Sequence, residues 1–215
     1  PMGFGLSVVR ERLPTMALIG ILSTVRKGLI KKARGSAVDA LLLEQANTLS
    51  SKGFSESVGQ IPWGSRIDKA TSEGVAKQRE NGCDFLIVGF EGTHLTALVP
   101  DGVAYFLALG SDADDKLLRG LEDLPIDGIY LDLEMKESFL TLEDLITVAG
   151  LRAVFSRYLV VRIPSAISEI ELENLSQAGV NGIAVDLKPL SGHKIDQLCA
   201  RLGSLPNRRT KRHER

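Results

Sequence analysis

Eight short apolar runs, separated by polar and often helical stretches, are the feature of this 215-residue chain that most constrains its fold. Most runs are continuously apolar, which is typical of strands buried on both faces of a parallel sheet. Strands alternating with helices predict an α/β fold, and eight repeats are the number that closes a (β/α)8 TIM barrel. We predict a compact barrel, with an open doubly wound parallel sheet as the alternative. The runs cover residues 16–23, 39–44, 61–68, 84–89, 103–110, 127–134, 158–164 and 182–187.

Helical patterns, with apolar residues three and four apart, lie between many of the runs. Thr141 with Asp144, and Ser168 with Glu171, have the spacing of capping boxes. A glycine that tolerates positive φ follows two of the predicted helices, at positions 82 and 179. The connections over residues 45–60 and 91–102 contain only short helical patterns. The predicted helices cover residues 69–81, 114–123, 141–155, 168–178 and 193–202.

The sequence also shows a weak internal repeat. Residues 39–44 are similar to residues 127–132, and residues 80–88 are similar to residues 177–185. Two four-strand halves of a barrel would produce this pattern, and chance similarity among short strands explains it about as well.

Length and charge favour one soluble domain over residues 15–203, between an N-terminal extension (1–14) and a basic tail (204–215) that we expect to be disordered. The net charge of -1 provides no general attraction to nucleic acid, so only the tail suggests such a partner. The longest apolar run, residues 13–22, is too short to cross a membrane. We expect a cytoplasmic protein with reduced cysteines, and a homo-oligomer stays open.

Charged residues at the ends of the apolar runs are the candidates for chemistry, because the carboxyl ends of barrel strands form the active face. Asp132 and Glu134 close the sixth run and point to the same side of the strand. Two such carboxylates suit a Mg²⁺ or Mn²⁺ ion or an acid/base pair, and a structural ion pair with Arg162 is equally consistent. Arg162 lies in an apolar strand, and its planar guanidinium suits the carboxylate or phosphate of a substrate.

Four further residues are candidates for substrate binding. Arg66 occupies a position in the third run similar to that of Arg162 in the seventh. Ser165 and Lys188 follow the seventh and eighth runs, where many barrels bind phosphate, and Lys188 would serve equally as a Schiff-base amine. His94 follows the fourth run, and histidine is a common general base near neutral pH. The sequence has no P-loop or dinucleotide fingerprint, so it indicates no nucleotide cofactor.

Part of the chain resembles a known enzyme family. Asp-Gly-Ile-Tyr-Leu-Asp-Leu-Glu at 127–134, Thr-Leu-Glu-Asp-Leu at 141–145, Val-Val-Arg-Ile-Pro at 160–164 and Ala-Gly-Val-Asn-Gly-Ile-Ala-Val at 178–185 carry the resemblance. Together they look like the central stretch of the 2-oxo acid aldolases and citrate lyase β-subunit relatives, which are phosphoenolpyruvate/pyruvate-type TIM barrels. The resemblance implies that Asp132 and Glu134 act as acid/base groups or metal ligands, and that Arg162 binds the carboxylate or enolate oxygen of a 2-oxo acid.

Two functions therefore stay open. The first is a lyase- or aldolase-like enzyme, a metal-assisted carbon–carbon lyase, that acts on a small anionic metabolite such as a 2-oxo acid or a phosphorylated compound. The second is a non-catalytic barrel that binds a ligand or organises an assembly. In the second case, the charges at the barrel rim would pair with one another.

Overall fold

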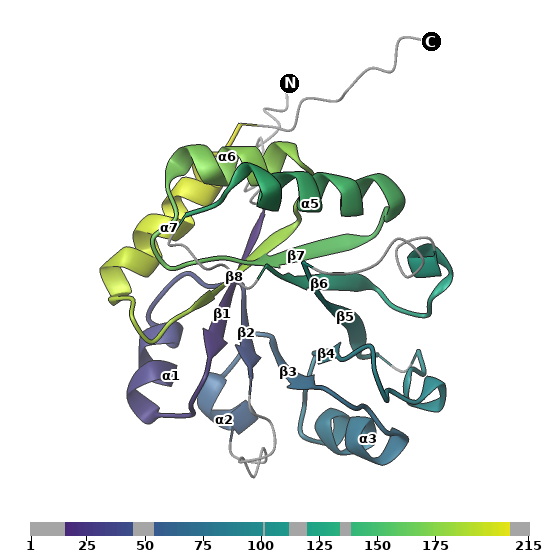
Figure 1. Cartoon of the computed structure of the whole chain (residues 1–215). Coiled ribbons are helices and arrows are strands. Elements are labelled where there is room, and N and C mark those ends of the chain that lie inside the picture. The colour runs from purple at the N-terminus through teal and green to yellow at the C-terminus, as the bar shows by residue number, and fades with distance from the viewer. Residues whose placement is uncertain (1–15, 45–53, 101, 112–119, 134–138, 207–215) are drawn as a thin grey trace, which may run out of the picture.

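A computed structural model describes residues 16–44, 54–100, 102–111, 120–133 and 139–206. In these ranges, eight parallel strands close into a barrel in sequence order, with β8 paired to β1 (Figure 1). The predicted TIM barrel is confirmed, and the closing pair excludes the open sheet, which would have two unpaired edges. The strands are β1 (Ala17–Leu22), β2 (Ala40–Leu43), β3 (Trp63–Ile67), β4 (Phe85–Val88), β5 (Ala104–Gly110), β6 (Gly128–Asp132), β7 (Tyr158–Arg162) and β8 (Gly182–Asp186).

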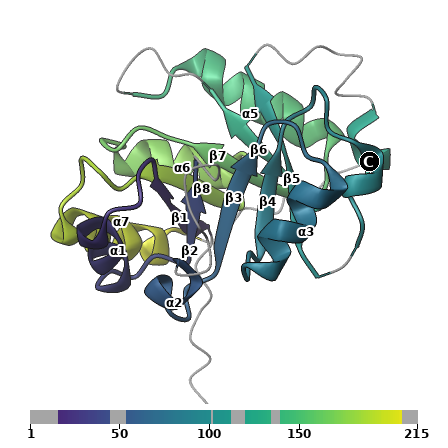
Figure 2. The same ribbon diagram turned by 90° about the horizontal axis from the view of Figure 1, so that it is seen from below.

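Helices surround the barrel on its outer side (Figures 1 and 2). As predicted, the connections after β2 and β4 contain little helix within the described ranges. The predicted helix over 114–123 lies mostly outside the described residues, as do the N-terminal extension and most of the basic tail. No helix in the described part of the chain is long and apolar enough to cross a membrane. The helices are α1 (Lys27–Arg34), α2 (Phe54–Val58), α3 (Ser72–Glu80), α5 (Leu142–Val154), α6 (Glu169–Gln177) and α7 (Gly192–Ser204), with 3-10 turns η3 (Leu95–Ala97) and η4 (Leu121–Asp123).

Local sequence signals set the ends of the outer helices. Thr141 and Asp144 form a reciprocal capping box at the start of α5, and Ser168 and Glu171 form another at the start of α6. Gly82 and Gly179 have φ values of 81° and 98°, which favour glycine. Both predicted capping boxes and both predicted helix-ending glycines are confirmed.

Alternate strand residues fill the inside of the barrel. The rings of Phe85 and Phe106 meet edge to face there, with centroids 6.0 Å apart. A Cβ atom at position 64 would lie 2.3 Å from the ring of Phe85, and one at position 128 would lie 2.5 Å from the ring of Phe106. Glycine at these two positions therefore makes room for the two rings. The buried members of this inner cluster are Ile19, Ile21, Leu42, Ile87, Tyr130, Val160 and Ala184.

One contact recurs four times at the amino end of the strands. The side chain of the residue just before each even-numbered strand accepts a hydrogen bond from the backbone N–H of a residue near the start of the preceding strand. The backbone N–H of the first residue donates in turn to the backbone carbonyl of the second. The pairs and side-chain distances are Asp39–Leu18 (2.7 Å), Asp84–Trp63 (2.9 Å), Asp127–Tyr105 (2.8 Å) and Asn181–Leu159 (3.0 Å). The internal repeat in the sequence therefore aligns Asp39 with Asp127 and Asp84 with Asn181, which make the same contact in four similar strand pairs.

Candidate functional site

A charged cluster lies at the carboxyl ends of the barrel strands. Asp132 and Arg162 end β6 and β7 and are direct register partners. Nη1 of Arg162 donates to Oδ2 of Asp132 at 3.2 Å and to Oε1 of Glu44 at 2.6 Å. Glu44 follows β2, so its contact joins segments 118 residues apart across the mouth of the barrel. We name Arg162, Glu44 and Asp132 the Arg162 cluster, and the ion pair between Asp132 and Arg162, one of the alternatives that the sequence left open, is present.

The Arg162 cluster is partly buried. The side chains of Arg162, Glu44 and Asp132 are 32%, 20% and 26% exposed. Burial alone would lower the pKa of Arg162, but the negative charges of Glu44 and Asp132 more than offset it, and the pKa is raised. Arg162 is therefore a permanent cation that remains within reach of a ligand entering from solvent.

Tyr130 lies under this cluster. It is two residues before Asp132 on β6, so both side chains point to the inside of the barrel. Its side chain is buried, and its hydroxyl has no hydrogen-bond partner among the described residues. Burial raises its pKa well above the usual range, and the charges of Arg162, Asp132 and Glu44 also act on it. The hydroxyl therefore stays protonated, with a hydrogen available to donate.

The other predicted site residues are not part of the Arg162 cluster, although the charge of Arg66 also acts on the hydroxyl of Tyr130. Arg66 on β3 directs Nε to Oδ1 of Asp68 at 3.0 Å, and Asp68 is 78% exposed. His94, Ser165 and Lys188 are exposed residues of loops after strands. Within the described ranges, no hydrogen bond or ion pair joins these three to Arg162 or Glu44. The structure thus brings together two of the predicted residues, Asp132 and Arg162, and leaves the substrate-binding roles of the others as predictions.

The predicted metal ligands receive limited support from the described residues. Glu134 lies outside them. Among the residues that are described, no three His, Cys, Asp or Glu side chains gather as a metal site. Asp132 instead contacts Arg162, whose positive charge would repel a cation bound beside it. Metal binding by Asp132 and Glu134 therefore stays a prediction.

Glu44 and Tyr130 are the two residues that sequence reasoning did not assign to the site. Both follow from the alternation of strand side chains. Tyr130 shares its face with Asp132, and Glu44 continues the face of Leu42, which belongs to the inner cluster. The contact between Glu44 and Arg162 additionally requires the closed barrel.

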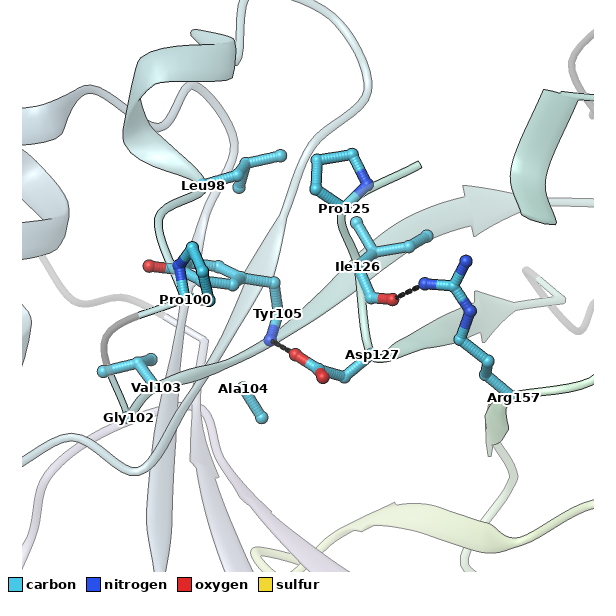
Figure 3. A pocket seen from close by; sticks show the side chains of 10 residues that line it. All are labelled: Leu98, Pro100, Gly102, Val103, Ala104, Tyr105, Pro125, Ile126, Asp127 and Arg157. Carbon is cyan, nitrogen blue, oxygen red and sulfur yellow. Dashed lines mark hydrogen bonds between the residues drawn. The ribbon is translucent and has the colours of Figure 1, made fainter. Parts of the chain in front are cut away.

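The structure also has a pocket of about 570 Å³ at the opposite end of the barrel (Figure 3). Its polar side chains are engaged by the backbone. Asp127 accepts from the N–H of Tyr105, and Arg157 donates to the carbonyls of Leu124 and Ile126. These contacts brace the loops before β6 and β7, so we do not place chemistry there. The lining residues are Leu98, Pro100, Gly102, Val103, Ala104, Tyr105, Pro125, Ile126, Asp127 and Arg157.

Comparisons with known proteins show that the chain is similar to solved structures but to no known sequence family. No protein-family model and no curated protein sequence matches the chain. Among solved structures, the thiamine phosphate pyrophosphorylase of Pyrococcus furiosus is similar with a TM-score of 0.64 and 13% identity, over 88% of this chain and 96% of that one. A mutant tryptophan synthase alpha-subunit from Pyrococcus furiosus has a TM-score of 0.64 and 11% identity, over 89% and 98%.

A third similar structure is the YdjI aldolase of Escherichia coli, with a TM-score of 0.55 and 14% identity over 87% of each chain. Identities this low carry the fold and not the chemistry. The comparisons therefore agree with the closed barrel of parallel strands: this chain has the TIM-barrel fold.

Proposed function

We propose that this chain is a TIM-barrel enzyme of the lyase or aldolase type that acts on a small anionic metabolite, a 2-oxo acid in preference to a phosphorylated compound. The observation that carries the proposal is Arg162, a partly buried cation held between two carboxylates at the mouth of the barrel. Active sites of TIM barrels lie at this end of the strands. An arginine fork there matches the two oxygens of a carboxylate.

In the proposed reaction, Arg162 binds the 2-oxo acid and stabilises the negative charge that develops on its carbonyl oxygen. That charge develops when a base removes a proton from the carbon next to the carbonyl, which leaves the electron pair as an enolate. We assign the base to Asp132, because its 3.2 Å contact with Arg162 is longer than the 2.6 Å contact of Glu44. Glu44 is then a positioning residue that holds the guanidinium.

Exchange of the methyl protons of pyruvate tests this proposal. Wild-type protein is incubated with pyruvate in deuterium oxide, with and without Mg²⁺ or Mn²⁺, and loss of the methyl signal is followed by proton NMR. We expect exchange in the wild type and at least a hundredfold slower exchange in Asp132→Asn. The matched control is Asp68→Asn, which removes a carboxylate of the same rim that pairs with Arg66. Exchange no faster than in buffer, under every condition, would refute the proposal.

A non-catalytic barrel is the second candidate, and one observation favours it. Two arginines of the described rim pair with carboxylates: Arg66 with Asp68, and Arg162 with Glu44 and Asp132. Such pairs are sufficient to explain charged residues at strand ends as structural contacts. If this candidate is right, the wild type shows no proton exchange, whether or not it binds pyruvate.

A further inference from the structure

The hydroxyl of Tyr130 is a buried polar group without a hydrogen-bond partner among the described residues. The side chain is 1% exposed, and its oxygen has no hydrogen bond within the described part of the chain. Most buried polar side-chain atoms in proteins are hydrogen-bonded, so each exception calls for an explanation. A phenylalanine would fill nearly the same volume without leaving a polar atom unsatisfied. Packing alone therefore does not explain why this position is a tyrosine.

The surroundings of Tyr130 indicate where that reason lies. Tyr130 lies two residues before Asp132 on the same face of β6, and the charges of Arg162, Asp132, Glu44 and Arg66 all act on its hydroxyl. The rest of the inner cluster is apolar, including Ile21 on β1. The charged mouth of the barrel is thus the side from which a polar partner can reach the hydroxyl.

We propose that the Tyr130 hydroxyl donates a hydrogen bond to an anionic oxygen of the small 2-oxo acid that Arg162 binds. The inference rests on the proposed function, because it uses the same mouth of the barrel. It places the ligand on the β6 side of Arg162, where Tyr130 and Asp132 extend from one face of one strand. Because burial keeps the phenol protonated, the hydroxyl is a donor at any working pH.

This pair of donors defines the class of ligand. Arg162 contributes a charged planar fork, and Tyr130 contributes a single neutral donor with apolar side chains around it. Two adjacent oxygens on a small flat anion, as in a 2-oxo acid, match this arrangement. Inorganic phosphate has more oxygens and more charge than these two donors satisfy. We therefore expect oxalate, a stable analogue of the pyruvate enolate, to bind more tightly than phosphate.

Calorimetric titration of the full chain with oxalate, pyruvate and phosphate tests the inference. The variant is Tyr130→Phe, and the matched control is Tyr158→Phe, which removes a phenol hydroxyl from a side chain that is 61% exposed at the start of β7. We expect Tyr130→Phe to bind oxalate at least about tenfold more weakly, because the lost hydrogen bond has a charged acceptor. Its Tm should equal or exceed that of the wild type, whereas Tyr158→Phe should bind as the wild type does.

The outcomes separate this inference from the proposed function. If the wild type binds oxalate and Tyr130→Phe binds it equally, the role of Tyr130 is refuted while the proposed site stands. If the wild type binds none of the three anions, the site and the inference both fail. If Tyr130→Phe does not fold, the near-ultraviolet difference spectrum of Tyr158→Phe, recorded with and without oxalate, tests whether the ligand contacts Tyr130. A perturbed tyrosine band supports the inference, and binding without any perturbation contradicts it.

Discussion

Replacing Glu44 by glutamine should make the protein bind anions more tightly. Glutamine keeps an oxygen that can accept the hydrogen bond from Arg162, so the guanidinium stays in place. What the substitution removes is the negative charge that neutralises part of Arg162. A ligand carboxylate bound by the same guanidinium then no longer experiences repulsion from Glu44.

The size of this effect follows from the distance between the two negative charges. A carboxylate on the other side of one guanidinium lies roughly 6 Å from Glu44, which gives a repulsion of about 0.7 kcal/mol in water and about 3 kcal/mol at an effective dielectric constant of 20. The cluster side chains are 20–32% exposed, so an intermediate value applies. We expect a gain of about 1 to 2 kcal/mol, or an affinity for oxalate about 5 to 30 times higher.

Calorimetry with oxalate at low ionic strength measures this gain, and added salt should reduce it. Asp68→Asn is the matched control, because it removes one negative charge from the same rim without touching Arg162. Its affinity should change less than about twofold. An unchanged or lower oxalate affinity in Glu44→Gln would refute the assignment of Arg162 as the anion-binding group.

Three further predictions concern stability, each checked by urea unfolding. Gly64→Ala should lower the free energy of unfolding by about 1–3 kcal/mol, because its Cβ would lie 2.3 Å from the ring of Phe85. The control Gly150→Ala adds a methyl group in open space on α5 and should raise the free energy of unfolding by up to about 1 kcal/mol. Asp84→Ala should cost about 1–3 kcal/mol because a backbone N–H loses its acceptor, and Asp84→Asn should cost much less, since asparagine fills the equivalent position before β8. Burial raises the pKa of the Cys83 thiol from 9.0 to about 11. The stabilisation that the buried thiol contributes is therefore complete below pH 9 and is lost as the pH rises through about 11. Between about pH 8 and about pH 11, the free energy of unfolding should fall less in Cys83→Ala than in the wild type. The first prediction is contradicted if Gly64→Ala has the stability of the wild type, and the second if Asp84→Asn is as unstable as Asp84→Ala. The third is contradicted if the stabilities of Cys83→Ala and the wild type depend on pH in the same way.

Much of the fold could be predicted because its determinants are local in sequence. Apolar runs, most of them continuous, marked all the strands of the barrel, and the pairs Thr141–Asp144 and Ser168–Glu171 marked two helix starts. Such signals depend on neighbouring residues and on hydrogen bonds within one turn. The weak repeat pointed to Asp84 and its equivalents, but the hydrogen bond from the N–H of Trp63 could be seen only in the assembled sheet.

The candidate site was predictable only where it depends on adjacent strands. Asp132 and Arg162 occupy corresponding ends of consecutive strands, so their contact followed from parallel register. The contact of Glu44 with Arg162 depends on how the barrel closes, because β2 and β7 are not neighbours in the sheet. The role of Tyr130 also depends on closure, which places one side chain of β6 near charges from β2 and β7.

The central claim is that Arg162 binds the carboxylate of a small 2-oxo acid, and one calorimetric experiment tests it most directly. Pyruvate and oxalate are titrated into the wild type, Arg162→Lys and Arg66→Lys. Lysine keeps the positive charge but lacks the planar fork, so we predict that Arg162→Lys binds at least about tenfold more weakly. Arg66 is directed to Asp68, so Arg66→Lys should change affinity less than about threefold. A wild type that binds neither anion, or an Arg162→Lys variant that binds as tightly as the wild type, would contradict the claim.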